Sequence, residues 1–311
     1  RPLCQRVAQA GRTPAIWGDM LFEHPEALQD LPKETLLFDW QYFRSPLATS
    51  GKLKDAGFRV VACPAVHTYN APWCHLPQTE RNIRDAHAAA TALDLEGVCI
   101  TTWECGLMGS YETLLPLLEA AGGILQGPAA PAADTLGPDA GQGGAEATSA
   151  YAAEQEAPGL LSGYLKKGEA HEEWARLMGI EVQKIGRSFA FGGIRSSLKC
   201  RLLLYRNPFL LWMHHAEEYL GEVGDAALSL AEQALVFAPD ASYRGPAQLL
   251  KGAVEFVRQS EKARLAYASG SVGEALTALS PCRQVFEDLE RFARSNHVRF
   301  GGSLADLERC K

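Results

Sequence analysis

The chain lacks any apolar run near the roughly 18 residues that a helix needs to span a bilayer. It also lacks a basic block, because 30 lysines and arginines are outnumbered by 37 acidic residues, for a formal net charge of −7. These absences argue against membrane and nucleic-acid partners. The eight cysteines include no C-x-x-C pair. Scattered thiols are typical of a reducing compartment, so we expect a cytoplasmic protein.

Metal and cofactor motifs are missing as well. Four cysteines and two histidines gather in one part of the chain, but their spacing matches no common zinc pattern. Cysteine often serves simply as a small buried hydrophobe. We therefore expect no metal and no cofactor. The six residues are Cys63, His67, Cys74, His75, Cys99 and Cys105.

Four short apolar runs recur in the first third of the chain, rich in β-branched or aromatic residues and without clean alternation. Such runs are typical of parallel strands buried on both faces. With amphipathic segments between them, they predict four consecutive βα units within residues 1–122. The last helix, 111–121, is expected to be capped by Ser110 and to end at Gly122. The runs are TPAIWGDM (13–20), ETLLFDWQYF (34–43), FRVVACPAV (58–66) and EGVCITTWE (96–104).

The remainder of the chain has a different character. Residues 123–147 are dense in glycine, alanine and proline, which predicts a linker or an extended surface segment. From 148 to 311 the apolar spacing becomes helical, and a helix near 224–238 is expected to stop at Pro239. The expected fold is thus α/β followed by an all-α carboxyl-terminal domain.

The first residues suggest that the sequence is a fragment. The chain begins at Arg1 without a methionine, and LCQRVAQAGRTPAIW has the pattern of a helix end, a glycine stop and a strand. That pattern is typical of the middle of an α/β protein. We therefore expect part of the protein to precede Arg1.

Aromatic residues mark the ends of the predicted strands. Trp17, Trp40 and Trp103 lie at or near the ends of three strands, and Tyr69 and Trp73 follow the remaining one. Ligands of parallel α/β folds bind at the carboxyl ends of the strands. Repetition at one position in each unit favours an aromatic-walled pocket. The alternative for each tryptophan is simple packing beneath a helix.

Polar residues accompany these aromatics. Asp19 follows Trp17, Asp39 precedes Trp40, His67 lies near Tyr69, and Glu104 is next to Trp103, all within two residues. Aromatic walls with a few fixed hydrogen-bonding groups suit sugar rings, whose C–H faces stack on indoles and whose hydroxyls need directional partners. For Asp19 and Glu104 the alternative is capping of the segments that follow them.

The same residues resemble a known family. PAIWGDM, LLFDWQY, CPAVHTYNAPW and GVCITTWE resemble, in order and spacing, strands five to eight of the catalytic barrel of glycoside hydrolase family 20, the β-N-acetylhexosaminidases. The likeness covers just over a third of the chain and is strongest to the hexosaminidase D-like branch. It implies that residues 1–122 are the second half of a TIM (β/α)8 barrel.

The resemblance also implies roles for individual residues. Trp17, Trp40 and Trp103 would wall the pocket for the acetamido methyl of the substrate, and Tyr69 would donate to the acetamido oxygen. Glu104 would bind sugar hydroxyls, and Asp19, the polar neighbour of Trp17, is a further candidate for substrate binding. The sequence departs from the family pattern at two places: Glu104 follows its tryptophan directly, with Cys105 in the expected acidic position, and Ala71 replaces an aspartate.

The reaction implied is removal of terminal β-linked N-acetylglucosamine or N-acetylgalactosamine by substrate-assisted retaining hydrolysis. The family's catalytic Asp–Glu pair follows strand four in a GGDE-like motif, which does not occur in this sequence. We therefore expect the pair to lie upstream and the chain alone to be inactive. The alternative is a non-catalytic carbohydrate-binding or scaffold protein built on a degenerate barrel.

Overall fold

The computed structural model describes residues 2–68, 72–102, 110–132, 156–185 and 220–295. The chain divides into two compact units that are not contiguous in sequence. The first unit comprises residues 1–66, 78–102 and 121–147, and the second comprises 67–77, 103–120 and 148–311. This grouping differs from the expected boundaries, because two segments from within 1–122 belong with the carboxyl-terminal helices.

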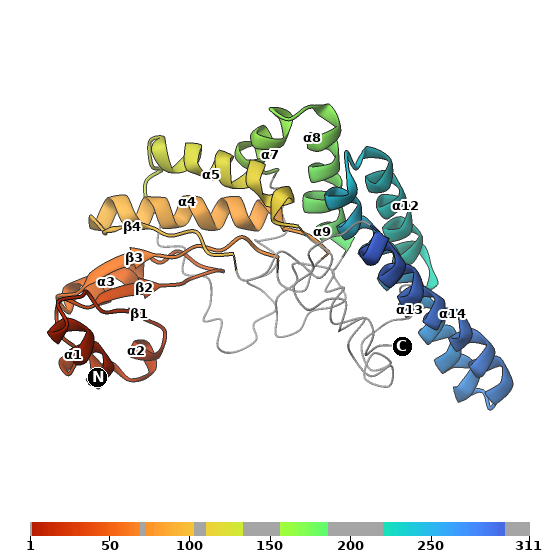
Figure 1. Cartoon of the computed structure of the whole chain (residues 1–311), viewed down its shortest axis with the longest axis horizontal. Coiled ribbons are helices and arrows are strands. Elements are labelled where there is room, and N and C mark those ends of the chain that lie inside the picture. The colour runs from red at the N-terminus through yellow and green to blue at the C-terminus, as the bar shows by residue number, and fades with distance from the viewer. Residues whose placement is uncertain (1, 69–71, 103–109, 133–155, 186–219, 296–311) are drawn as a thin grey trace. The chain divides into compact units, whose positions relative to one another are not determined.

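The first unit is built on a four-stranded parallel sheet. Its strands β1 (Ala15–Trp17), β2 (Leu36–Asp39), β3 (Arg59–Ala62) and β4 (Gly97–Val98) lie side by side in chain order (Figure 1). Each strand falls within one of the four apolar runs of the sequence, which confirms the predicted α/β character of this region. Within the described residues β1 and β4 are the two edges of the sheet.

One face of this sheet carries the core of the first unit. Leu37 and Val60 of the sheet pack with residues from helices α1 (Pro2–Gln9), α2 (Met20–Glu23) and α3 (Leu47–Asp55). Cys4, Leu21 and Leu53 are the buried contributions of those three helices. The short 3-10 helix η1 (Pro25–Gln29) follows α2. Helices α1, α2 and α3 therefore cover the same face.

Helix α4 (Leu76–Leu93) ties down the segments that follow β2 and β3. The Asn82 side chain accepts a hydrogen bond from the backbone N–H of Ala65 at 2.8 Å and donates to the backbone oxygen of Gln41 at 2.6 Å. Gln78 donates to the backbone oxygen of Tyr42 at 2.9 Å. Buried backbone groups need partners, so these two amides fix the chain where it leaves the sheet.

The helix predicted over 111–121 is longer than expected. A 3-10 turn, η2 (Tyr111–Leu114), leads into α5 (Leu115–Gln126), and Ser110 caps it by accepting from the backbone N–H of Glu112 at 3.3 Å. The cap is confirmed, but the predicted stop at Gly122 is wrong. Gly122 and Gly123 have no neighbouring atom within 4 Å of an added Cβ. Glycine costs a helix only about 1 kcal/mol, which is not enough to end it there.

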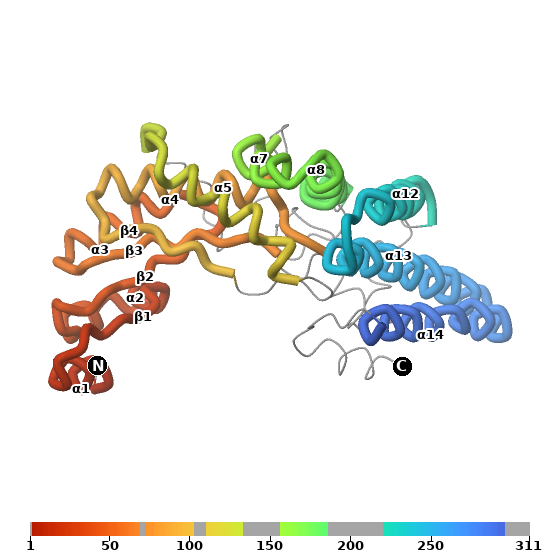
Figure 2. Tube along the Cα trace, turned by 45° about the horizontal axis from the view of Figure 1, so that its top comes forward, coloured from red at the N-terminus to blue at the C-terminus, as the bar shows by residue number. Residues whose placement is uncertain are grey.

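The assigned elements between residues 156 and 295 are helices throughout the described parts. Helix α12 ends at Phe237, just before the predicted stop at Pro239, and Asp240 caps α13 by accepting from the backbone N–H of Ser242 at 2.8 Å. Figures 1 and 2 show α13 and α14 running side by side. The helices are α7 (Pro158–Leu165), α8 (Glu169–Arg176), α9 (Val182–Ile185), α12 (Glu222–Phe237), α13 (Ala241–Ala268) and α14 (Val272–Ser295).

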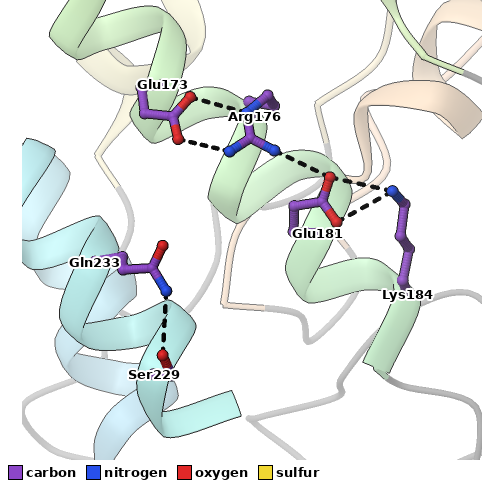
Figure 3. Close-up of polar contacts among 6 residues, drawn as sticks. All are labelled: Glu173, Arg176, Glu181, Lys184, Ser229 and Gln233. Atoms are coloured by element: carbon purple, nitrogen blue, oxygen red, sulfur yellow. Dashed lines mark hydrogen bonds and ion pairs between the residues drawn. The ribbon is translucent and has the colours of Figure 1, made fainter. Parts of the chain in front are cut away.

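A π-helical turn, η3 (Leu177–Glu181), joins α8 to α9. The wider turn places residues five apart above one another. Accordingly, Arg176 bonds Glu181 at 3.1 Å while also holding Glu173 at 2.6 Å, and Lys184 approaches Glu181 at 3.1 Å (Figure 3). In the same view Gln233 donates to Ser229 across one turn of α12 at 3.1 Å. These charges are partly exposed, so their contribution to stability is small.

Buried aromatic rings form the core of the second unit. Trp73, Tyr164 and Trp174 are fully buried, and the Trp73 ring lies 5.6 Å from Tyr164 and 4.6 Å from Trp174. The Trp73 indole N–H donates to the Thr113 hydroxyl at 3.0 Å. The expectation that Trp73 lies on the rim of an aromatic pocket is therefore wrong. Its indole is a packing element, as the alternative interpretation held.

Gly179 lies against this aromatic core. A Cβ at this position would meet Leu76 Cγ at 2.6 Å and Trp73 Cζ3 at 2.9 Å. Gly179→Ala is therefore expected to lower the free energy of unfolding by roughly 1–3 kcal/mol through overpacking. Urea unfolding followed by circular dichroism measures the loss.

The matched control is Gly273→Ala at an exposed position in the first turn of helix α14, where an added Cβ has nothing within 4 Å. Helix propensity predicts unchanged or slightly higher stability for this variant. If both alanine variants unfolded at the same urea concentration, the close packing at Gly179 would be refuted.

Candidate functional site

The register of the parallel strands places aromatic side chains in a row across the sheet. Trp17 pairs with Phe38, and Phe38 pairs with Val61. Directly paired residues point to the same face, and successive residues point to opposite faces. Leu37 and Val60 pack toward the helices, so Trp17, Phe38 and Val61 occupy the opposite face. We call this face the aromatic face.

Trp17 is the most exposed member of the row. Its side chain is 43% exposed, whereas Val61 is 9% exposed. The Trp17 ring meets Phe38 edge-on, with 5.7 Å between ring centroids. A large indole left nearly half exposed at a strand end offers a flat apolar surface of the kind that binds ring-shaped ligands.

Trp40 continues the aromatic face one residue past β2. It is two positions after Phe38, so an extended chain keeps both side chains on the same face. The Trp40 indole is half-buried and stacks against Tyr42 in a tilted arrangement, with 4.9 Å between centroids and 32° between planes. The structure therefore brings two of the sequence-predicted tryptophans, Trp17 and Trp40, to the same face and the same end of the sheet.

Asp39, the polar neighbour of Trp40, points the other way. Its side chain is 1% exposed and faces α3, where the hydroxyls of Thr49 and Ser50 each donate to Oδ2 at 2.7 Å. Gln41 donates to Oδ1 at 2.9 Å. Burial raises the pKa of the Asp39 carboxyl, although these hydrogen bonds partly oppose it. The expectation that Asp39 accompanies Trp40 in a pocket is wrong, because Asp39 anchors α3 to the sheet.

Asp19 begins helix α2 without capping it. Its side chain makes no capping hydrogen bond to that helix and is half-buried. The capping alternative is therefore not observed for Asp19. The carboxylate follows Trp17 by two residues at the carboxyl edge of the sheet, where it was expected.

The other three predicted site residues, Tyr69, Trp103 and Glu104, lie outside the described residues. The chain is described up to His67 and Thr68 on one side and up to Thr102 on the other, and both His67 and Thr68 are buried. Their assignments to the pocket stay predictions.

Two features at the carboxyl edge of the sheet were not predicted from the sequence. Asn82 and Gln78 hold the loops after β2 and β3, and they lie on α4 among other buried polar residues, Thr79 and Glu80, so no local sequence signal marks them. The other is a cysteine pair, Cys63 and Cys99, brought side by side by strands 36 positions apart in sequence. The sequence alone does not show that these two cysteines are neighbours, because their proximity follows only from the strand register.

Metal and membrane sites were sought in the same described parts of the chain. No group of three or more histidine, cysteine, aspartate or glutamate side chains is placed there to hold a metal ion. None of the helices described combines the length and the apolar character that crossing a membrane requires.

Comparison with known proteins assigns no family. A scan against models of known protein families and a search among curated protein sequences give no match to this chain. Its function is therefore inferred from the geometry of the sheet and from the side chains at its carboxyl edge.

The raised pKa of the Asp39 carboxyl predicts the direction in which the stability of the protein changes with pH. Because its pKa in the folded protein is raised above the usual 3.8, it contributes stability that is fully present below that pH and is lost as pH rises through the raised pKa. The Asp39→Asn variant has no ionisable carboxyl at this position, so it does not lose this stability as the pH rises. Unfolding free energies from urea titrations should therefore shift in favour of the variant as pH rises from about 4 toward 7.

Asp55→Asn is the matched control, since Asp55 is exposed at the end of the same helix, α3. It should show a much smaller pH-dependent difference from the wild type. A difference that moved in favour of the wild type in the Asp39→Asn series would contradict the raised pKa of Asp39.

Proposed function

We propose that the first unit is the second half of a (β/α)8 barrel that binds terminal β-linked N-acetylhexosamine on its aromatic face. The parent activity is that of an O-glycosyl hydrolase, a β-N-acetylhexosaminidase of the family 20 type. The observation that supports the proposal is the strand register, which puts Trp17 and Phe38 on one face at the carboxyl edge of the sheet, and alternation along the chain extends this face to Trp40.

The topology supports a barrel over a doubly wound sheet. The strands follow chain order without reversal, and the residues of α1, α2 and α3 pack on one face. Right-handed crossovers that all advance in one direction put every helix on the same side, as a barrel requires. A doubly wound sheet reverses its order and carries helices on both faces.

The aromatic face supports a saccharide ligand. In this proposal Trp17 and Trp40 wall the site for the acetamido methyl, and the nearby Asp19 carboxylate accepts hydrogen bonds from ring hydroxyls. An apolar wall and a directional acceptor match the two kinds of surface on an N-acetylated sugar. The roles of Tyr69, Trp103 and Glu104 as acetamido donor, third wall and second hydroxyl partner stay predictions from the sequence.

The chemistry proposed is substrate-assisted. The acetamido oxygen of the substrate attacks the anomeric carbon while an aspartate orients it and a glutamate protonates the leaving group. The described residues of the first unit supply walls for this reaction, but Asp39 is engaged by Thr49 and Ser50. The carboxylate pair is therefore proposed to come from outside this sequence.

Ligand binding tests the proposed wall. Isothermal titration calorimetry should show N-acetylglucosamine binding more tightly than glucose, which lacks the acetamido group. Trp17→Ala should weaken that binding about fivefold, because loss of one stacking surface costs roughly 1 kcal/mol.

Tyr267→Ala is the matched control, because Tyr267 is an aromatic residue 59% exposed on helix α13 of the second unit. Its affinity for N-acetylglucosamine should equal that of the wild type. Equal affinity in Trp17→Ala and Tyr267→Ala would overturn the assignment of Trp17 to the site.

Turnover by the chain alone is expected to be absent. An aryl N-acetyl-β-glucosaminide should release no phenol above the rate of a buffer control, because no acid pair is provided for the leaving group. Robust hydrolysis that survives purification would refute the proposed division between pocket wall and catalytic acids.

A non-catalytic carbohydrate-binding or scaffold protein is the second candidate. The structural use of the Asp39 carboxylate favours it, since this buried carboxylate at the end of β2 holds helix α3 in place. The gene sequence upstream of the codon for Arg1 separates the two. An H-x-G-G-D-E-like motif in the same reading frame favours the enzyme, and a start codon close to Arg1 favours the binding protein.

A further inference from the structure

Cys63 and Cys99 are direct neighbours across two parallel strands. The recorded register pairs Ala62 with Val98 and, further along, Ala65 with Thr101. Cys63 and Cys99 occupy the next position after the first of these pairs. The Cys99 backbone N–H donates to the Ala62 oxygen at 2.9 Å, which fixes the alignment at this point.

This alignment satisfies the distance requirement of a disulfide. Adjacent strands lie about 4.8 Å apart, within the roughly 4.4–6.8 Å between Cα atoms that disulfides span. Directly paired residues also project to the same face of the sheet. Both thiols are free in the structure, and the Cys63 thiol donates to the backbone oxygen of Val61 at 3.5 Å.

The two thiols differ in access to solvent. Cys99 is exposed, whereas Cys63 is 1% exposed. An exposed thiol reacts with small oxidants, and a buried neighbour resolves the product without competing for the reagent. The pair therefore combines an exposed thiol that an oxidant can reach with a buried thiol that can close the disulfide.

We propose that Cys63 and Cys99 form a redox modification site, in which a low-molecular-weight disulfide such as oxidised glutathione converts the two thiols into a reversible cross-strand disulfide. The site does not depend on the proposed carbohydrate function. It lies on the aromatic face, because Cys63 follows Val61 by two positions and continues the same alternation.

The reaction proceeds in two balanced exchanges. The Cys99 thiolate attacks one sulfur of oxidised glutathione, so that a mixed disulfide forms and one glutathione leaves. Cys63 loses its proton to solvent and attacks Cys99 Sγ, so that the protein disulfide forms and the second glutathione leaves. Two protein thiols are oxidised, and one glutathione disulfide is reduced to two thiols.

Burial slows the second exchange. It raises the pKa of the Cys63 thiol, and the neighbouring Cys99 and Asp39 act on it in the same direction. The thiolate is the nucleophile, so Cys63 attacks the mixed disulfide more slowly than an exposed thiol at the same place would.

Peptide mapping tests the site. The protein is incubated with oxidised glutathione, blocked with an alkylating agent and digested without reduction by a protease that cleaves after aromatic residues. Tyr69 separates Cys63 from Cys74, and Trp103 separates Cys99 from Cys105. A second protease that cleaves after arginine separates Cys74 from Cys99 at Arg81 and Arg84, so that each cysteine falls in its own peptide. A linked pair containing Cys63 and Cys99 is expected, and it should disappear on reduction.

Single variants assign the order of steps. Cys63→Ser should stop at a glutathione adduct on Cys99, and Cys99→Ser should yield neither the adduct at this position nor the linked peptide. Cys74→Ser, which removes a buried thiol of the second unit, should still form the linked pair. All samples are checked for native circular dichroism before oxidation.

Two outcomes would overturn the proposal. The first is a wild-type protein in which Cys99 carries glutathione indefinitely and no linked peptide forms. The second is a linked peptide that joins either cysteine to a different partner while Cys63 and Cys99 are both intact.

Discussion

Parallel pairing of four strands in chain order is the constraint on which the rest of this structure depends. Once β1 to β4 are aligned, alternation along each strand sends Leu37 and Val60 toward the helices and Trp17 and Phe38 to the opposite face. A shift of one residue would exchange the two sets. The helical core, the aromatic face and the cysteine pair all follow from one register.

The same register separates neighbours that look alike in the sequence. Asp39 and Trp40 are adjacent, yet the carboxylate joins α3 to the sheet while the indole lies beside Tyr42 on the other side. A buried acid and a half-buried aromatic side chain thus occupy consecutive positions and lie on opposite faces of the sheet. Tryptophan burial divides in a comparable way, because Trp73 is enclosed in the second unit while Trp17 stays 43% exposed.

Much of the fold was predictable from local pattern. The four strands lie in the four apolar runs, Ser110 caps the segment that leads to α5, and α12 ends before Pro239, because strand composition, caps and breakers are properties of short stretches. The face of the sheet on which a side chain lies, and the residues that it contacts, were harder to predict from the sequence. The apolar runs lack clean alternation, so the local sequence does not show that the Asp39 side chain faces the helices. The sequence around Trp73 likewise gives no sign of its contact with Trp174. The proximity of Cys63 to Cys99 is likewise a product of non-local pairing.

The central claim is that Trp17 and Trp40 form the wall of an N-acetylhexosamine site. The indole N–H signals of the six tryptophans, assigned by single Trp→Phe variants in a proton–nitrogen correlation spectrum, test it directly. Addition of N-acetylglucosamine should shift the Trp17 and Trp40 signals in a saturable manner and leave those of the buried Trp73 and Trp174 in place. Saturable shifts confined to Trp73 and Trp174, or no shift at Trp17 and Trp40 at saturating sugar, would contradict the claim.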